Sequence, residues 1–260
     1  MPYADVNDQH IYFEDSGGSG PPVIFSHGFL MDHEMFAPQV EALAGEFRCI
    51  TWDERGFGQT AATAPFTYYD SAADCLALLS HLGIQQAVLA GMSQGGFLSL
   101  RAALTAPERV KALVLIDTQA GVEDPATLGG YQAMNDEWAT NGPGNVQDAI
   151  AGLILGAGID PAPWFAKWNA APKEALSLPF DCLVGRDDIS PRLAEITCPA
   201  IIFHGEQDMA ITMDKAEALC AGLADCVGIV PVPGAAHAAN LSHPDVVNPP
   251  LQEFLAKYAN

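Results

Sequence analysis

The sequence predicts an α/β fold, built on a mostly parallel central sheet with helices on its faces. Two observations lead to this prediction. Short apolar runs that end in Gly, Pro or Asp alternate with longer segments of helical periodicity, which is typical of βαβ units. The 260 residues are also 49% hydrophobic and only 17% charged, so the chain is long and apolar enough to bury a large core.

Several segments have the composition of strands, because they are short and rich in Val, Ile or Phe. They are residues 10–14, 22–26, 48–52, 87–91, 112–116, 200–204 and 227–232. The runs in the middle of this series are continuously apolar, which indicates strands that are buried on both faces of a parallel sheet.

Two helices are predicted from apolar side chains at positions i, i+3, i+4 and i+7. The first pattern lies in residues 75–82 and the second in residues 251–258. Pro249 and Pro250 directly precede the second pattern, and proline favours the first turn of a helix. We therefore expect the last helix to begin at these prolines and to pack on the sheet.

The regular alternation stops between residues 118 and 193. This segment holds three of the four Trp residues, several Pro and Gly, and no clear strand. A long structureless loop is uncommon in a compact domain, so we expect an inserted helical cap, with helices at residues 131–138 and 146–155. The predicted core then comprises residues 1–117 and 194–260, and the predicted cap comprises residues 118–193.

The composition is strongly acidic. With 11 Lys and Arg against 32 Asp and Glu, the formal charge is −21. Such a surface repels phosphate backbones and anionic lipids, so neither nucleic acid nor a membrane is an expected partner. Adaptation to salt and simple solubility both remain open as reasons for the acidity.

The cysteines show no metal-binding pattern. All six lie apart, without a C-x-x-C pair or the His and Cys spacing of a zinc site, so no metal is expected. We expect buried free thiols, and a Cys220–Cys226 disulfide is the less favoured alternative. Residues 1–11 have neither the basic nor the apolar segment of a signal peptide, so a cytoplasmic location is expected.

The clearest catalytic motif is G-M-S-Q-G-G at residues 91–96. It follows a predicted strand and precedes a predicted helix at residues 97–104, which is the context that the G-x-S-x-G nucleophile turn requires. Gly91 and Gly95 allow strand and helix to approach closely, and the sharp turn exposes the Ser93 hydroxyl. Ser93 is therefore the candidate nucleophile, and the backbone N–H of Gln94, at the start of the helix, is a candidate oxyanion donor.

A second oxyanion donor is expected from the turn H-G-F at residues 27–29, which ends another predicted strand. Gly28 permits close backbone approach, and Phe29 offers its backbone N–H. We expect His27 to hold this loop by hydrogen bonds rather than to act as an acid or base.

A serine nucleophile needs a histidine base that is oriented by a carboxylate. Asp208 follows the strand at residues 200–204, and His237 follows the last strand, so the chain order is Ser, Asp, His. Asp117, at the end of another strand, remains an alternative acid. The surrounding sequence predicts exposed side chains for four other histidines, His10, His33, His81 and His243. His204 is expected to pack at a strand end.

These motifs, together with D-E-R-G-F-G-Q-T at residues 53–60, resemble the α/β-hydrolase fold family over essentially the whole chain outside the cap. The resemblance is to the branch with a serine nucleophile, which includes small bacterial carboxylesterases and enol-lactonases. It implies a small helical cap after the sixth strand, Ser93 as nucleophile, His237 as base and Asp208 as its acid. It also implies the Phe29 and Gln94 amides as the oxyanion hole, and Asp53 and Arg55 as scaffold.

The expected activity is hydrolysis of small, mostly uncharged carboxylic esters through an acyl-enzyme, without a cofactor. Lactone hydrolysis and perhydrolysis on the same triad are alternatives, and a non-catalytic small-ligand binding protein is an alternative of another class. The cap has only four Lys and Arg, which argues against a dianionic substrate. Its side chains Trp138, Leu153, Trp164 and Trp168 are candidates for the substrate pocket.

Overall fold

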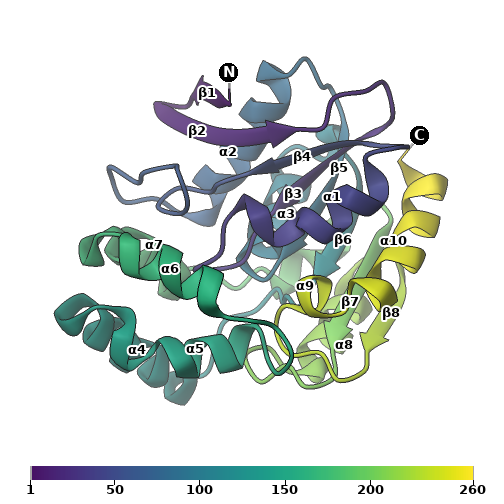
Figure 1. Cartoon of the computed structure of the whole chain (residues 1–260). Coiled ribbons are helices and arrows are strands. Elements are labelled where there is room, and N and C mark those ends of the chain that lie inside the picture. Colours follow the sequence, from purple (N-terminus) through teal and green to yellow (C-terminus); the bar gives the residue numbers. More distant parts are fainter. Residues whose placement is uncertain (1, 260) are drawn as a thin grey trace.

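The computed structural model describes residues 2–259 as an α/β fold around one eight-stranded sheet, shown in Figure 1. The strands are β1 (Tyr3–Val6), β2 (Gln9–Asp15), β3 (Pro22–Ser26), β4 (Arg48–Trp52), β5 (Ala87–Met92), β6 (Val110–Ile116), β7 (Ala200–Gly205) and β8 (Cys226–Val232). Their spatial order is β1-β2-β4-β3-β5-β6-β7-β8. The pairs β1–β2 and β2–β4 are antiparallel, and the remaining pairs are parallel. The predicted mostly parallel sheet is thus confirmed, while the short edge strand β1 was not predicted.

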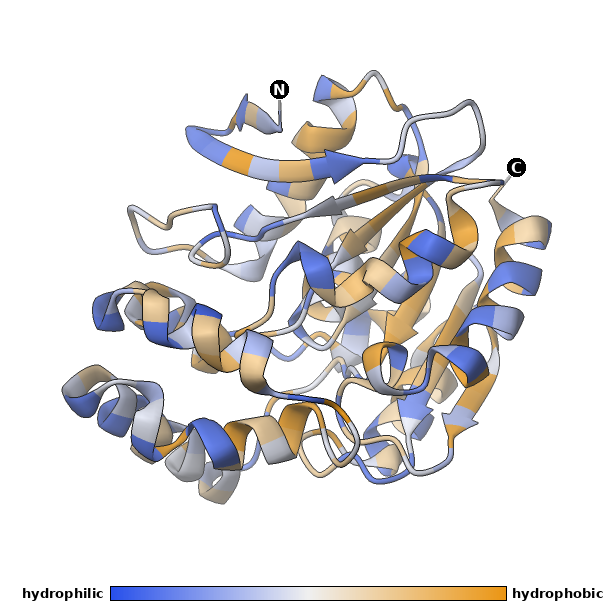
Figure 2. Cartoon of the chain, in the orientation of Figure 1, coloured by the Kyte–Doolittle hydropathy of each residue, from blue (hydrophilic) through white to orange (hydrophobic). Residues whose placement is uncertain are grey.

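The central parallel strands, β3 to β7, are buried on both faces, as their continuous apolar runs indicate, whereas the edge strand β8 is only partly buried. In β3, for example, Val23 and Phe25 join one hydrophobic core and Ile24 joins the other. Successive side chains point to opposite faces of a strand, so a strand between two cores cannot carry a polar alternation. Figure 2 shows the hydrophobic residues concentrated in these central strands.

Helices cover both faces of the sheet. They are α1 (Ala37–Leu43), α2 (Tyr68–His81), α3 (Gln94–Thr105), α8 (Met213–Gly222), the short α9 (Ala239–Ser242) and α10 (Pro244–Tyr258). Residues from α1 and α10 belong to one core, and residues from α2, α3 and α8 belong to the other. Within residues 2–259, no helix has both the length and the apolar composition needed to cross a membrane.

Between β6 and β7 the chain forms a separate group of helices, seen in teal and green in Figure 1. They are α4 (Pro125–Asn141), α5 (Gln147–Ile154), α6 (Ala162–Ala170) and α7 (Ser177–Val184). Along the whole described chain there are also short 3-10 helices: η1 (His33–Phe36), η2 (Pro107–Arg109), η3 (Pro143–Asn145), η4 (Lys173–Leu176) and η5 (Ser190–Glu195). The helices expected at residues 131–138 and 146–155 correspond to α4 and α5.

The last helix begins earlier than predicted. It starts at Pro244, so that Pro249 and Pro250 lie inside α10 rather than at its start. The turns before these prolines are held by tertiary contacts, because Val247 is buried in the core and the Asn248 amide donates to the Pro38 carbonyl at 3.1 Å. Proline keeps a helical φ, but inside a helix it removes a backbone hydrogen bond and its ring crowds the carbonyl one turn earlier, and tertiary packing offsets these costs here.

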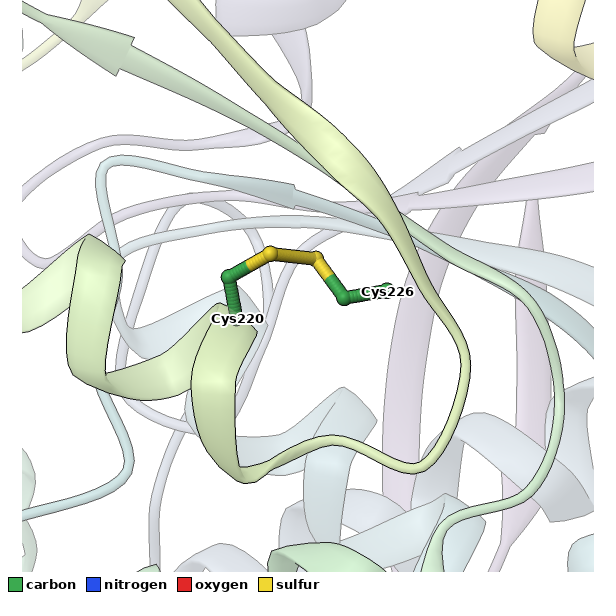
Figure 3. The surroundings of a disulfide bond; sticks show 2 residues. All are labelled: Cys220 and Cys226. Atoms are coloured by element: carbon green, nitrogen blue, oxygen red, sulfur yellow. A yellow bond between two sulfur atoms is a disulfide. The ribbon is translucent and has the colours of Figure 1, made fainter.

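One expectation about the cysteines was wrong. Cys220, near the end of α8, and Cys226, at the start of β8, form a disulfide, which Figure 3 shows. The tight connection between α8 and β8 brings the two Cα atoms to 5.4 Å, a separation that a disulfide requires. The other four cysteines are free thiols.

We expect the Cys220→Ser/Cys226→Ser variant to unfold with a free energy about 2 kcal/mol lower than that of the unmodified protein, because the disulfide closes a short loop and restricts the unfolded chain. Urea unfolding under non-reducing conditions measures the difference. Thiol titration of the denatured, unreduced protein should find four thiols, and finding six would contradict the bridge.

Candidate active site

Ser93 lies in a sharp turn between β5 and α3, with φ 51° and ψ −112°. A non-glycine residue adopts such a backbone only when its surroundings impose it. The surroundings here are glycines: a Cβ added at Gly91 would overlap the Gly95 carbonyl, and one added at Gly95 would overlap the Ser26 carbonyl. Strand and helix can therefore approach closely only because both positions lack side chains.

Hydrogen bonds from neighbouring segments hold the strained turn. The Ser93 N–H donates to the Ile116 carbonyl at 2.9 Å, and the Thr118 hydroxyl donates to the Ser93 carbonyl at 2.7 Å. The Ser93 side chain is thereby kept at the carboxyl end of the sheet, where the strands β5 and β6 end.

His237 and Asp208 meet at the same end of the sheet. The His237 Nδ1 lies 2.7 Å from the Asp208 Oδ2, and the other oxygen, Oδ1, accepts the N–H groups of Ala210 at 2.8 Å and Ile211 at 3.0 Å. This carboxylate therefore keeps a fixed orientation, and it favours the tautomer in which Nδ1 carries the proton and Nε2 can accept one.

Asp117, the alternative acid, contacts the backbone instead of the His237 ring. Its Oδ1 accepts the Gly205 N–H at 2.7 Å, and its Oδ2 accepts the Ala239 N–H at 3.0 Å, so it joins the end of β7 to the segment that follows His237. Complete burial, followed by repulsion from Asp208, raises the pKa of Asp117 well above its usual range.

The pKa of His237 is raised from its usual value of 6.5. Burial by itself lowers the pKa of an imidazole, but the negative charge and the hydrogen bond of Asp208 outweigh this, with smaller contributions from Asp117 and Glu123. The ring is therefore a stronger base than an isolated histidine.

His27 has the architectural role expected from the sequence. Its Nδ1 donates to the Gly28 carbonyl at 2.8 Å, and its Nε2 accepts the Glu54 N–H at 3.0 Å. One ring nitrogen thus donates while the other accepts, which requires a neutral imidazole. Its burial lowers the pKa of His27 and agrees with that state.

The sequence predicts that two backbone N–H groups form an oxyanion hole. Those of Phe29 and Gln94 have no hydrogen-bond acceptor within residues 2–259, and the second belongs to the first residue of α3, where helical N–H groups are unpaired. A Cβ at Gly28 would overlap the Met92 sulfur, so the glycine lets the Phe29 turn lie close to the end of β5.

Ser93 and His237 both border one apolar cavity, which contains about 810 Å³ of empty space, including some that is open to solvent. Apart from Ser93 and His237, it is lined by Phe29, Leu30, Met92, Phe97, Glu123, Tyr131, Met134, Asn135, Trp138, Ile150, Leu153, Ile154, Leu176, Phe180, Leu183, Ala210 and Ile211. The mostly aromatic and aliphatic lining is typical of a site for a small organic molecule.

Two of the four side chains predicted to form the substrate pocket lie at the cavity. Trp138 and Leu153 line this cavity, whereas Trp164 and Trp168 do not. The Trp168 indole donates to the Leu30 carbonyl at 2.7 Å, and the Trp164 ring lies under the Lys167 ammonium at 4.4 Å. Trp168 thus joins the helical segment to the loop at Leu30, and Trp164 packs in the hydrophobic core beside Lys167 of its own helix.

No lysine or arginine of residues 2–259 lines the cavity, and the cationic side chains of residues 118–193 already have hydrogen-bond partners. Their partners are Asp32 and Glu34 for Lys167, the Thr140 carbonyl for Lys173, Glu123 for Arg186 and Glu195 for Arg192. The cavity therefore offers no free positive charge to an anionic substrate.

Two buried groups have the side chains of a cation site. They are Asp32, His33 and Asp53, and Asp117, His204 and Asp208. In both groups a central carboxylate is already engaged: Asp53 accepts the His33 N–H at 2.8 Å and the Gln59 N–H at 2.8 Å, and Asp208 holds His237. The contacts of Asp53 hold backbone segments together, and the contact of Asp208 orients His237.

Sequence reasoning missed two features near the site. His33, expected to be exposed, is buried, because its Nδ1 bonds Asp53 at 2.7 Å across the sheet end. Glu123 was not predicted to line the cavity, and no motif marks it. His204 is buried at the end of β7, as expected.

Comparison with known proteins identifies the family of the chain. Residues 21–158 match the family model for the alpha/beta hydrolase fold, and the chain belongs to that family. A thermophilic esterase from Thermogutta terrifontis has a similar structure, with a TM-score of 0.88, 26% identity and coverage of 100% of this chain and 98% of that one. For the enol-lactonase from Burkholderia xenovorans LB400 the TM-score is 0.89, with 26% identity and coverage of 98% and 100%. A Synechocystis sp. protein provisionally named a non-heme chloroperoxidase is 29% identical, with 98% of this chain and 100% of that protein covered.

We expect the His237 imidazole to titrate above 6.5, and Asp208→Asn to lower its pKa, because the substitution removes the negative charge that stabilises the imidazolium. NMR titration of the imidazole measures both values. An unchanged His237 pKa in the variant would contradict the role of Asp208 in this pair.

Proposed function

We propose that this protein is a serine hydrolase that cleaves carboxylic esters of small, mostly uncharged substrates through an acyl-enzyme. The observation that carries the proposal is the arrangement at the cavity. Ser93, in a strained turn, borders the same apolar cavity as His237, and the His237 Nδ1 is hydrogen-bonded to Asp208. In this proposal, residues 118–193 act as a lid that shapes the cavity.

The proposed reaction begins when the His237 Nε2 takes the Ser93 proton and the Ser93 Oγ attacks the ester carbonyl. The N–H groups of Phe29 and Gln94 stabilise the oxyanion of the tetrahedral intermediate. The intermediate collapses as His237 returns the proton to the leaving alcohol, and a water activated by His237 then hydrolyses the acyl-enzyme. No cofactor is needed for these steps.

The apolar cavity supports the preference for uncharged substrates. Its lining has one carboxylate, Glu123, and no lysine or arginine, so a carboxylate on the substrate would lose its hydration without gaining a cationic partner. The aromatic and aliphatic lining instead favours apolar acyl or alcohol groups.

Lactone hydrolysis is the second candidate, and the similarity to an enol-lactonase structure favours it. A lactone reacts by the same steps, except that the leaving hydroxyl stays attached to the acyl group. Turnover of neutral lactones and of acyclic esters of the same size compares the two candidates directly.

Ser93→Ala should lower kcat/KM for a p-nitrophenyl ester at least about 10⁴-fold, because no other nucleophile replaces the hydroxyl. A fluorophosphonate probe should add once to the unmodified protein, at Ser93, and leave the variant unlabelled in an intact-mass measurement. Labelling at another residue, or substantial turnover by the folded variant, would overturn the assignment.

Asp208→Asn should lower kcat about 10⁴-fold, because asparagine neither favours the required His237 tautomer nor stabilises the imidazolium. Asp117→Asn should have a smaller effect, since Asp117 accepts backbone N–H groups and makes no hydrogen bond to the ring. Steady-state kinetics with a p-nitrophenyl ester compares the two. The reverse order would make Asp117 the functional acid.

A further inference from the structure

A buried ion pair lies in the wall of the cavity. Glu123, on the segment between β6 and α4, lines the cavity, and its carboxylate pairs with the Arg186 guanidinium, which follows α7. The two side chains are only 6% and 2% exposed, respectively. Gln119 also donates to the Glu123 carboxylate, at 2.9 Å.

Arg186 is fixed directly behind the lining. Its guanidinium donates to the Leu183 carbonyl at 2.9 Å and lies 4.4 Å from the centre of the Phe97 ring. Glu123, Phe97 and Leu183 all line the cavity, whereas Arg186 does not. The arginine is thus one side chain away from the cavity, and its Nε has no hydrogen-bond partner among the described residues.

The negative partner is therefore the one that the cavity meets. The charge of Glu123 also acts on Tyr131, another lining residue. Burial and then this charge raise the pKa of Tyr131 to about 12. A buried arginine without a carboxylate partner would instead attract anions strongly, because guanidinium groups bind carboxylates in paired hydrogen bonds.

We propose that the Glu123–Arg186 pair determines the charge selectivity of the substrate site: Glu123 neutralises Arg186 and thereby excludes substrates that carry a carboxylate. This inference rests on the proposed esterase function and adds to it a specificity-determining residue. Removing the Glu123 charge exposes the cavity to the arginine, and removing the Arg186 charge leaves the cavity negative.

Two esters of equal size test the proposal. In p-nitrophenyl isocaproate and p-nitrophenyl hemisuccinate, the acyl groups end in an isopropyl group and a carboxylate, respectively. The readout is the ratio of their kcat/KM values, so that a general loss of activity cancels. The unmodified protein should favour the isocaproate.

Glu123→Gln should shift the ratio toward the hemisuccinate by about tenfold or more, since a charge in a dry site acts over several ångströms. Arg186→Gln should shift it in the opposite direction. Each variant leaves one buried charge unpaired and can lower stability. Either one decides the question if the other does not fold, because unchanged ratios in a folded variant would overturn the proposal.

Two further variants separate the effect of this ion pair from that of the overall charge of the protein. Glu195→Gln removes an equal charge from the exposed Arg192–Glu195 pair and should leave the ratio unchanged. The double variant Glu123→Gln/Arg186→Gln has neither charge and should restore the ratio to within about twofold of the unmodified protein. A ratio in the double variant like that of Glu123→Gln alone would overturn the role of Arg186.

Failure of this inference is distinguishable from failure of the proposed function. If the unmodified protein cleaves neither ester and takes up no fluorophosphonate, the esterase proposal fails, and this inference fails with it. If it cleaves the isocaproate but the ratios do not change, only the charge selectivity is overturned.

Discussion

The site depends on the close approach of β3, β5 and α3 around Ser93. At Gly95 the helix backbone meets the Ser26 carbonyl so closely that no side chain fits between them. This contact permits the left-handed backbone of Ser93, and the Ile116 carbonyl and the Thr118 hydroxyl hold it. The strain is local, whereas the packing that sustains it comes from two large hydrophobic cores.

Three buried carboxylates near the site show how surroundings give one chemical group different roles. Asp208 accepts two backbone N–H groups with one oxygen and binds the His237 ring with the other, so the carboxylate has a fixed orientation toward the ring. Asp117 accepts only backbone N–H groups, and burial favours its protonated form. Glu123 is paired with an arginine, which permits a charge inside an apolar cavity.

Two of the errors of sequence reasoning share a physical cause, which is contact between distant segments, whereas the third concerns a disulfide between residues only six apart. The local pattern favoured a helix start at Pro249, but packing of Val247 and the Asn248 contact to Pro38 extend α10 to Pro244. The Cys220–Cys226 disulfide follows from the tight connection of α8 to β8, which spacing alone does not reveal. His33 is buried because Asp53 lies beside it, although the two are distant in sequence.

The order of the core strands, the parallel sheet and the serine turn are predictable from the amino-acid sequence. These depend on periodicity and on glycines whose effect is local, so residues 91–96 are interpretable without a structure. The carboxylate that binds His237 and the side chains that meet the cavity are identified by the folded arrangement. Those outcomes depend on how separate strand ends and helices converge: the Asp208 carboxylate lies 2.7 Å from the His237 Nδ1, whereas the Asp117 carboxylate accepts the N–H groups of Gly205 and Ala239.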